Sequence, residues 1–188
     1  MSSAPPPCPP EIARLLHKYE VLASLRAARA RGEPIPERAV FKALAAELPG
    51  ALYELDRLPI EDIESRRAAL ADVASGAAPV APWMTAMAAY HALYRAALHV
   101  KARSRKHHTP GPEEAAALAA SASRHAGVPV ASSFVIAVTL PERGRIGPVV
   151  LAEVAARTGQ TPSATLAALF PTRRDFSPTG DDDPEQPR

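Results

Sequence analysis

Proline and glycine divide this chain into segments whose apolar residues recur at helical spacing. The first segment follows Pro10, which suits the first position of a helix, and Gly32 would end it. Between these two residues the apolar side chains stand three or four positions apart, as one buried face of a helix requires: Ile12, Leu15, Leu16, Tyr19 and Leu22. The same spacing recurs through most of the chain, and the sequence therefore predicts an all-α protein.

Further helices are predicted to begin near residues 36, 52, 60 and 83. The first of them would bury Val40 and Phe41, and the third carries an i,i+4 pair, Asp62 and Arg66, that supports a helix. The last and longest, Trp83 to Arg105, has a broad apolar face that holds the only Trp and two of the four Tyr. We expect this helix to be the centre of the core.

The run Thr109-Pro110-Gly111-Pro112 breaks helices strongly and predicts a domain boundary. We expect an N-terminal helical bundle over 11–108, a linker at 109–112 and a smaller helical module over 113–176. The Pro-rich residues 1–10 and the acidic residues 177–188 are expected to be disordered tails. Phe134–Leu140 is β-branched enough for a strand, but no partner strand is evident, which favours a buried helix.

Composition favours closely packed helices and excludes some classes of site. Hydrophobic residues make up 47% of the chain, and many of them are Ala, the best helix former and a small core filler. The single cysteine, Cys8, can form neither an intrachain disulfide nor a Cys-based zinc site. No apolar run approaches the length of a membrane span and no signal peptide is recognisable, so we expect a bacterial-type cytoplasmic protein without a membrane partner.

The most informative stretch is residues 148–170. Pro148 would open a helix, and Gly159 can end it in the left-handed conformation at low cost. Thr161 is a natural N-cap and Pro162 a natural first residue for a second helix. On these two predicted helices the residues expected to face inward are Val150, Leu151, Val154, Leu166 and Leu169. A helix, a tight turn and a capped second helix form the order of a helix-turn-helix, whose second helix enters the major groove of DNA.

Two known families share this pattern. Glu153–Thr165 resembles the helix-turn-helix of bacterial sigma-factor region 4, and Leu140-Pro141-Glu142-Arg143 with Arg145 resembles the opening of that region. Val154–Phe176, which includes Phe170-Pro171-Thr172-Arg173-Arg174-Asp175-Phe176, resembles the reading head of TetR-type repressors. The resemblances cover about the last quarter of the chain, and they imply DNA binding by this segment.

The predicted function is therefore that of a DNA-binding regulator of transcription, without enzymatic activity or a cofactor. The second helix would lie nearest the bases, and arginines on either side of it would hold phosphates. The residues expected at the DNA are Arg157, Gln160, Thr161, Ser163, Ala164, Thr165, Arg173 and Arg174. The alternative is an all-helical interaction module without DNA binding, in which the Trp83–Leu98 face or the first helix pairs with another protein or a second copy.

Other polar clusters are weaker candidates for function. The basic run Lys101–His108 could contact phosphates, although cations are also favoured at a helix C-terminus and remain solvated there. His91, Arg95 and His99 share one side of the long helix, but the two histidines are two turns apart, too far to share a metal ion without a third element. Ser163 lies outside any nucleophile-elbow pattern, and the chain contains no glycine loop for a phosphate.

Overall fold

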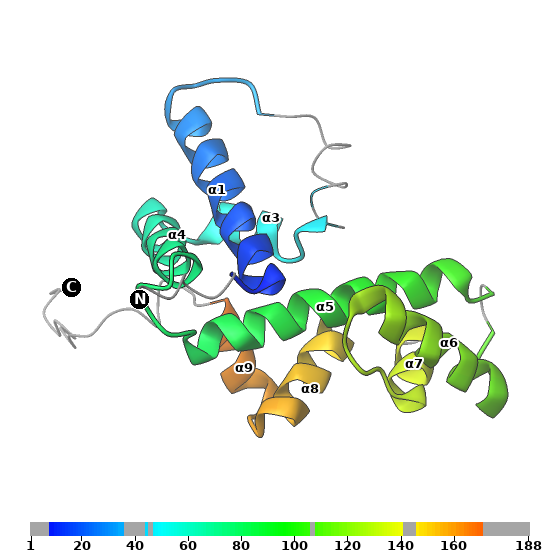
Figure 1. Ribbon diagram of the computed structural model, residues 1–188. Coiled ribbons are helices and arrows are strands. Elements are labelled where there is room, and N and C mark those ends of the chain that lie inside the picture. Colours follow the sequence, from blue (N-terminus) through cyan, green and yellow to red (C-terminus); the bar gives the residue numbers. More distant parts are fainter. Residues whose placement is uncertain (1–7, 36–43, 45–46, 106–107, 141–145, 171–188) are drawn as a thin grey trace, which may run out of the picture.

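The structure is a computed structural model that describes residues 8–35, 44, 47–105, 108–140 and 146–170 (Figure 1). The secondary structure of these residues is helical, without a strand among them, which confirms the predicted all-α class. Residues 1–7 of the predicted N-terminal tail, the whole predicted acidic tail at 177–188 and the residues Val40 and Phe41 lie outside the described residues. The helices are α1 (Pro10–Ala30), α3 (Ala51–Arg57), α4 (Ile60–Ala74), α5 (Pro82–Arg103), α6 (Pro112–Ala126), α7 (Ser132–Thr139), α8 (Ile146–Thr158) and α9 (Pro162–Leu169).

Proline and glycine set many of the helix ends, as predicted. Proline stands in the first turn of α1, α5, α6 and α9, where its fixed φ suits the helix and its missing N–H costs no hydrogen bond. Gly127 at the end of α6 and Gly159 at the end of α8 have positive φ values of 74° and 68°. These residues stop the helices because a glycine adopts the left-handed conformation without steric cost.

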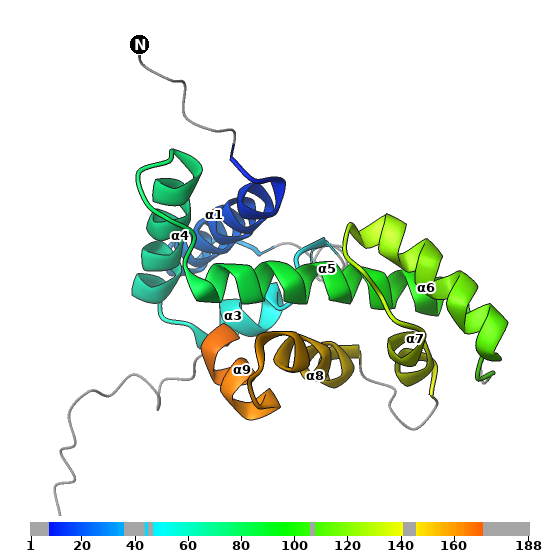
Figure 2. The same ribbon diagram turned by 60° about the horizontal axis from the view of Figure 1, so that its bottom comes forward.

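The long helix α5 is the centre of the fold, as expected. It packs against α1 and, on other sides, against α6, α7, α8 and α9. Figures 1 and 2 show α1 and α4 on one side of α5, with α8 and α9 on the opposite side and α6 and α7 toward its C-terminal end. The side chains that α5 buries include Met84, Met87, Tyr90, Leu93, Ala96, Ala97 and Val100. The apolar face of α5 is therefore covered by this chain's own helices.

The packing of α6 shows why the chain is rich in alanine. The buried residues of α6 are all alanines, and they repeat at helical spacing: Ala115, Ala119, Ala122 and Ala126. Small side chains on this stripe allow α6 to approach α5 closely. The segment around Phe134–Leu140 is helical, as favoured above, and Phe134, Val135 and Val138 of α7 are buried. Contacts of α7 with α5, α6 and α8 explain why it is apolar on several sides.

Helices before and after the predicted linker share α5 as a common packing surface. Phe170, the residue after α9, packs edge-on against Tyr90 of α5 with ring centroids 5.2 Å apart. The predicted i,i+4 pair of Asp62 and Arg66 is wrong. Arg66 instead turns inward and donates hydrogen bonds to the Tyr19 hydroxyl at 2.7 Å and to the backbone carbonyl of Leu169 at 3.0 Å.

Candidate functional site

The turn between α8 and α9 has the geometry predicted from the sequence. Gly159 adopts φ = 68°, and the next residue, Gln160, donates its backbone N–H to the carbonyl of Ala155 at 2.9 Å. This bond spans six residues and is typical of a helix that ends in a Schellman motif. The Thr158 hydroxyl also donates to the carbonyl of Val154 at 3.0 Å, so a side-chain hydrogen bond satisfies a carbonyl in the last turn of α8.

The second helix of the pair begins at a satisfied cap. Thr161 is extended, with φ = −78° and ψ = 152°, and its hydroxyl oxygen accepts the backbone N–H of Ala164 at 3.2 Å. Pro162 follows as the first helical residue. Four of the predicted DNA-contacting residues lie together here and are exposed to solvent: Gln160, Thr161, Ser163 and Ala164.

Two expectations for the face of α9 are wrong. Thr165 was expected at the bases, but its side chain is 0% exposed and its hydroxyl donates to the Gln160 side-chain carbonyl at 3.3 Å. Leu166 was expected to face inward, but it is 44% exposed. The reason is the rotation of the helix: Thr165 and Leu169, four residues apart, form its buried side. Thr165 therefore acts on the Gln160 side chain rather than on a ligand.

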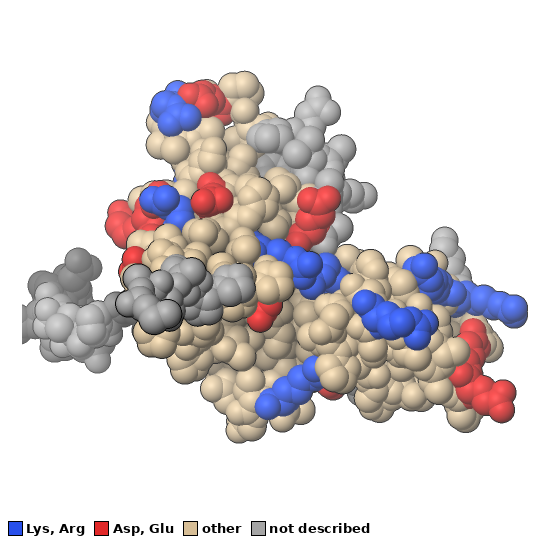
Figure 3. All heavy atoms as spheres, viewed as in Figure 1, with Lys and Arg blue, Asp and Glu red and all other residues tan. Residues whose placement is uncertain are grey.

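The predicted phosphate-binding arginines are only partly placed. Arg157 pairs with Glu153 one turn earlier, with 2.9 Å between Nε and Oε1, and it donates to the backbone carbonyl of Pro129 at 2.6 Å. Arg173 and Arg174 lie outside the described residues. Residues 159–170 contain neither Lys nor Arg. On the face shown in Figure 3, a stretch of blue atoms crosses the region of α8 and α9, and further Lys and Arg atoms lie over α5 and α6.

A buried ionic network holds the end of α9 in place. Glu54 of α3 is fully buried, forms an ion pair with the equally buried Lys18 of α1, and accepts a hydrogen bond from the Tyr19 hydroxyl. Arg66 joins this network through Tyr19 and reaches the carbonyl of Leu169. The guanidinium group of Arg66 also lies over the ring of Trp83, 5.0 Å from the centroid, a cation–π contact.

Burial sets the charge states in this network. Lys18 donates to the carbonyl of Pro49 at 3.0 Å, and its Nζ lies 3.3 Å from Nε2 of His91. Burial and, secondarily, the charges of Lys18 and Arg95 hold the pKa of His91 well below its usual range, so His91 is neutral and accepts this bond. Burial lowers the pKa of Lys18, and the adjacent Glu54 carboxylate opposes that shift.

Sequence reasoning missed the network, although one signal for it was visible. Lys18 stands within the apolar stripe of α1, three residues after Leu15 and next to Tyr19, where a charged side chain must be buried and paired. The role of the network is structural, because its contacts join α1, α3, α4 and α5 to the end of α9.

The remaining polar candidates have structural partners. The Arg103 guanidinium donates to Nδ1 of His99 at 3.1 Å, and Nε2 of His99 lies 2.9 Å from the Ser121 hydroxyl. The described part of the chain contains no cluster of three or more His, Cys, Asp or Glu residues that could hold a metal ion. Its helices also include none that is both long and apolar enough to cross a bilayer.

Comparison of the chain with known protein families, with curated proteins and with solved structures found no match. The case for a function therefore depends on the geometry described above.

Proposed function

We propose that this protein is a DNA-binding regulator of transcription that uses α8 and α9 as a helix-turn-helix. The observation that carries the proposal is the exposed, capped start of α9 directly after a glycine turn. At this helix start Pro162 has no N–H and the Thr161 hydroxyl accepts the N–H of Ala164, which leaves the backbone N–H of Ser163 and the positive end of the helix dipole for an anionic partner. In this proposal the first turn of α9 faces the major groove.

The exposed polar groups at this helix start suit a limited reading of bases. The Gln160 carbonyl accepts the Thr165 hydroxyl, which fixes the side chain and leaves its amide N–H groups for an acceptor such as N7 of a purine. The hydroxyl of Ser163 is exposed and can donate or accept, and the methyl group of Ala164 suits a thymine methyl. We expect modest discrimination between bases, because few of the exposed side chains here are of the types that usually distinguish bases.

Phosphate contacts in this proposal come mainly from outside α9. Arg173 and Arg174 follow Phe170, whose ring is buried against Tyr90. Because both the affinity and its salt dependence grow with the number of phosphate contacts by Lys or Arg, the few available arginines predict weak binding with a shallow salt dependence. Arg157 contributes only if it gives up its bond to the Pro129 carbonyl.

A second candidate is a protein-interaction module, and one observation favours it. The exposed side of α9 beyond its first turn is uncharged and largely apolar, and it consists of Leu166, Ala167 and Ala168. This surface differs from the one expected from the sequence, since the Trp83–Leu98 face is largely buried inside the fold. In this candidate α9 binds a second copy of the chain through Leu166.

Recovery of genomic DNA with the full chain at two salt concentrations separates the candidates. Discrete sequences that survive the higher salt support the proposed regulator, whereas a diffuse, salt-labile signal supports only non-specific contact. Absence of enrichment at both salts contradicts the regulator. In that case, self-association that is lost in Leu166→Glu would support the interaction module.

A further inference from the structure

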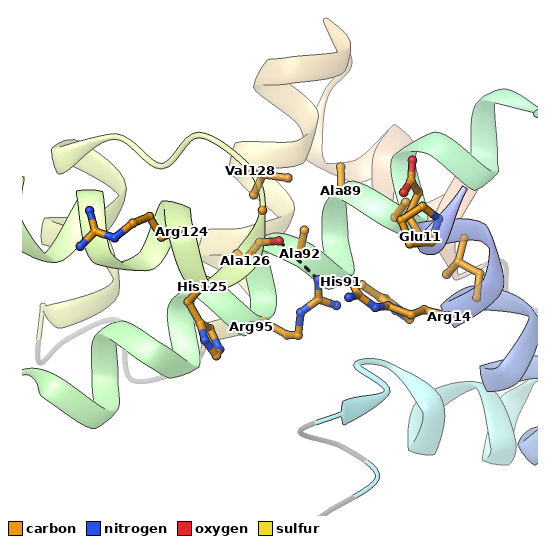
Figure 4. A pocket seen from close by; sticks show the side chains of 14 residues that line it. Glu11, Arg14, Ala89, His91, Ala92, Arg95, Arg124, His125, Ala126 and Val128 are labelled. Carbon is orange, nitrogen blue, oxygen red and sulfur yellow. Dashed lines mark hydrogen bonds between the residues drawn. The ribbon is translucent and has the colours of Figure 1, made fainter. Parts of the chain in front are cut away.

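An open pocket of about 560 Å³ lies between the start of α1, the middle of α5 and the end of α6 (Figure 4). Its volume falls in the range typical of small-molecule sites, about 300–1,000 Å³. Alanines of α5 and Val128 give it an apolar lining. The titratable side chains that line it are Glu11, Arg14, His91, Arg95, Arg124 and His125.

The pocket carries positive charge that the described part of the chain does not neutralise. Arg14, Arg95 and Arg124 form no ion pair with any described residue, and Glu11 is the one carboxylate in the lining. Among the described residues, Arg95 makes one hydrogen bond, a long one of 3.5 Å to the backbone carbonyl of Ala126. Burial first, and the nearby charge of Arg14 second, lower the pKa of Arg95. Two guanidinium groups thus repel each other in a partly desolvated site.

The arrangement in Figure 4 separates the charges from the apolar surface. Arg95 lies in the middle of the pocket, with His125 on one side and His91 and Arg14 on the other. Arg124 stands at the outer edge. His91 supplies no charge, because its low pKa keeps it neutral and its Nε2 is bound to Lys18. The cations that can meet a ligand together are therefore Arg14 and Arg95.

We propose that this pocket binds a small organic anion, a carboxylate or phosphate ester on an apolar body. Arg14 and Arg95 hold the oxyanion, since guanidinium groups offer planar pairs of donors that match carboxylate and phosphate oxygens. Val128 and the alanines of α5 cover the apolar body. The negative charge of a bound anion offsets the repulsion between the two arginines. This favours binding of an anion over occupancy by water.

The pocket is also connected to the helix pair. Gly127 and Val128 form part of its lining, and the next residue, Pro129, offers the carbonyl that Arg157 of α8 binds at 2.6 Å. Arg157 lies in the last turn of α8, directly before the Gly159 turn. A ligand that moves this segment would reposition α9, and the anion would then act as an effector. This regulatory part rests on the proposed function, whereas binding of the anion does not.

Calorimetric titration of the full chain with benzoate, octanoate, phenyl phosphate and inorganic phosphate tests the binding. We expect at least one organic anion to bind one per chain, with a Kd of about 1 mM or lower. Arg95→Gln and, separately, Arg14→Gln should weaken it by about tenfold. The exposed arginine of α4 gives the matched control, Arg67→Gln, which should bind like the wild type. Arg14 is exposed and has no ion pair with a described residue, so its variant serves even if Arg95→Gln fails to fold.

The outcomes separate the two parts of the inference. The pocket proposal is overturned if no organic anion binds, if inorganic phosphate alone binds, or if both arginine variants bind as the wild type does. If benzoate or phenyl phosphate binds through the arginines and also changes the affinity for recovered DNA, both parts are supported. If the anion binds and the DNA affinity is unchanged, the effector role is refuted. If the anion binds and the protein recovers no DNA, the proposed function fails while the pocket stands.

Discussion

The guanidinium group of Arg66 on α4 donates a hydrogen bond to the backbone carbonyl of Leu169, the last residue of α9, across 3.0 Å. The last carbonyls of a helix have no partner within the helix, and a cation near them also meets the negative end of the helix dipole. Arg66 therefore acts as a C-terminal cap supplied from 103 residues earlier in the chain. The placement of α9 depends on the N-terminal helices.

Replacement of Arg66 tests this cap. Arg66→Gln removes the bonds to Leu169 and Tyr19, and we expect the free energy of unfolding to fall by about 1–3 kcal/mol. The amides of α9 should also exchange hydrogen faster, because the end of that helix loses its anchor. Urea denaturation and hydrogen exchange measure the two effects. The neighbouring Arg67→Gln, on the surface, should change stability by no more than about 0.5 kcal/mol. Equal effects of the two variants would refute the cap.

The ion pair of Lys18 and Glu54 should show strong coupling. Lys18→Met leaves Glu54 buried without its closest cation, and we expect it to cost about 3–5 kcal/mol. The double variant Lys18→Met/Glu54→Gln removes the carboxylate charge and keeps an acceptor for Tyr19 and Arg66. It should recover much of the lost stability. A double-mutant cycle in urea measures the coupling, and simple additivity of the two single changes would show that the pair does not act as a unit.

Stability should depend on pH through His91. Burial lowers the pKa of His91 in the folded protein, so that below about pH 6.5 the unfolded chain takes up a proton that the folded chain does not. The unfolded state then binds more protons, and the free energy of unfolding falls as the pH falls, by up to about 1.4 kcal/mol per pH unit. His91→Gln keeps an acceptor for Lys18 and should flatten this dependence. His17→Gln, exposed on α1, should not. Parallel slopes for both variants would contradict the role of His91.

Two glycines with positive φ should differ in their response to substitution. Gly159 has open space where a Cβ would stand, so Gly159→Ala should cost only the backbone strain, about 1–2 kcal/mol. A Cβ at Gly50, whose φ is 81°, would stand 2.5 Å from the ring of Phe170, so Gly50→Ala should cost clearly more. Thermal unfolding of the two variants compares them. A smaller loss for Gly50→Ala would mean that Phe170 is not held as described.

Local features of the helix pair were predictable, and its rotation was not. Gly159 and Thr161 define the turn and the cap through their own backbone and side-chain chemistry, so sequence alone placed them. Thr165 rather than Leu166 lies on the buried side because of contacts with other helices. The sequence of a short helix without a distinct apolar face does not encode this choice. The pocket was not predictable for the same reason, because Arg14 and Arg95 meet only through the packing of α1 on α5.

The affinity of one variant for DNA recovered by the wild type tests whether the start of α9 contacts DNA. Ser163→Glu adds an acid in the first turn of α9, where the helix dipole favours it, so the fold should be preserved while the charge repels DNA. Ala120→Glu adds the same charge at an exposed position of α6 as the matched control. In fluorescence anisotropy at low salt, we expect a loss of affinity of at least about tenfold for Ser163→Glu relative to Ala120→Glu. Equal affinity of the two variants would contradict the placement of α9 at the DNA.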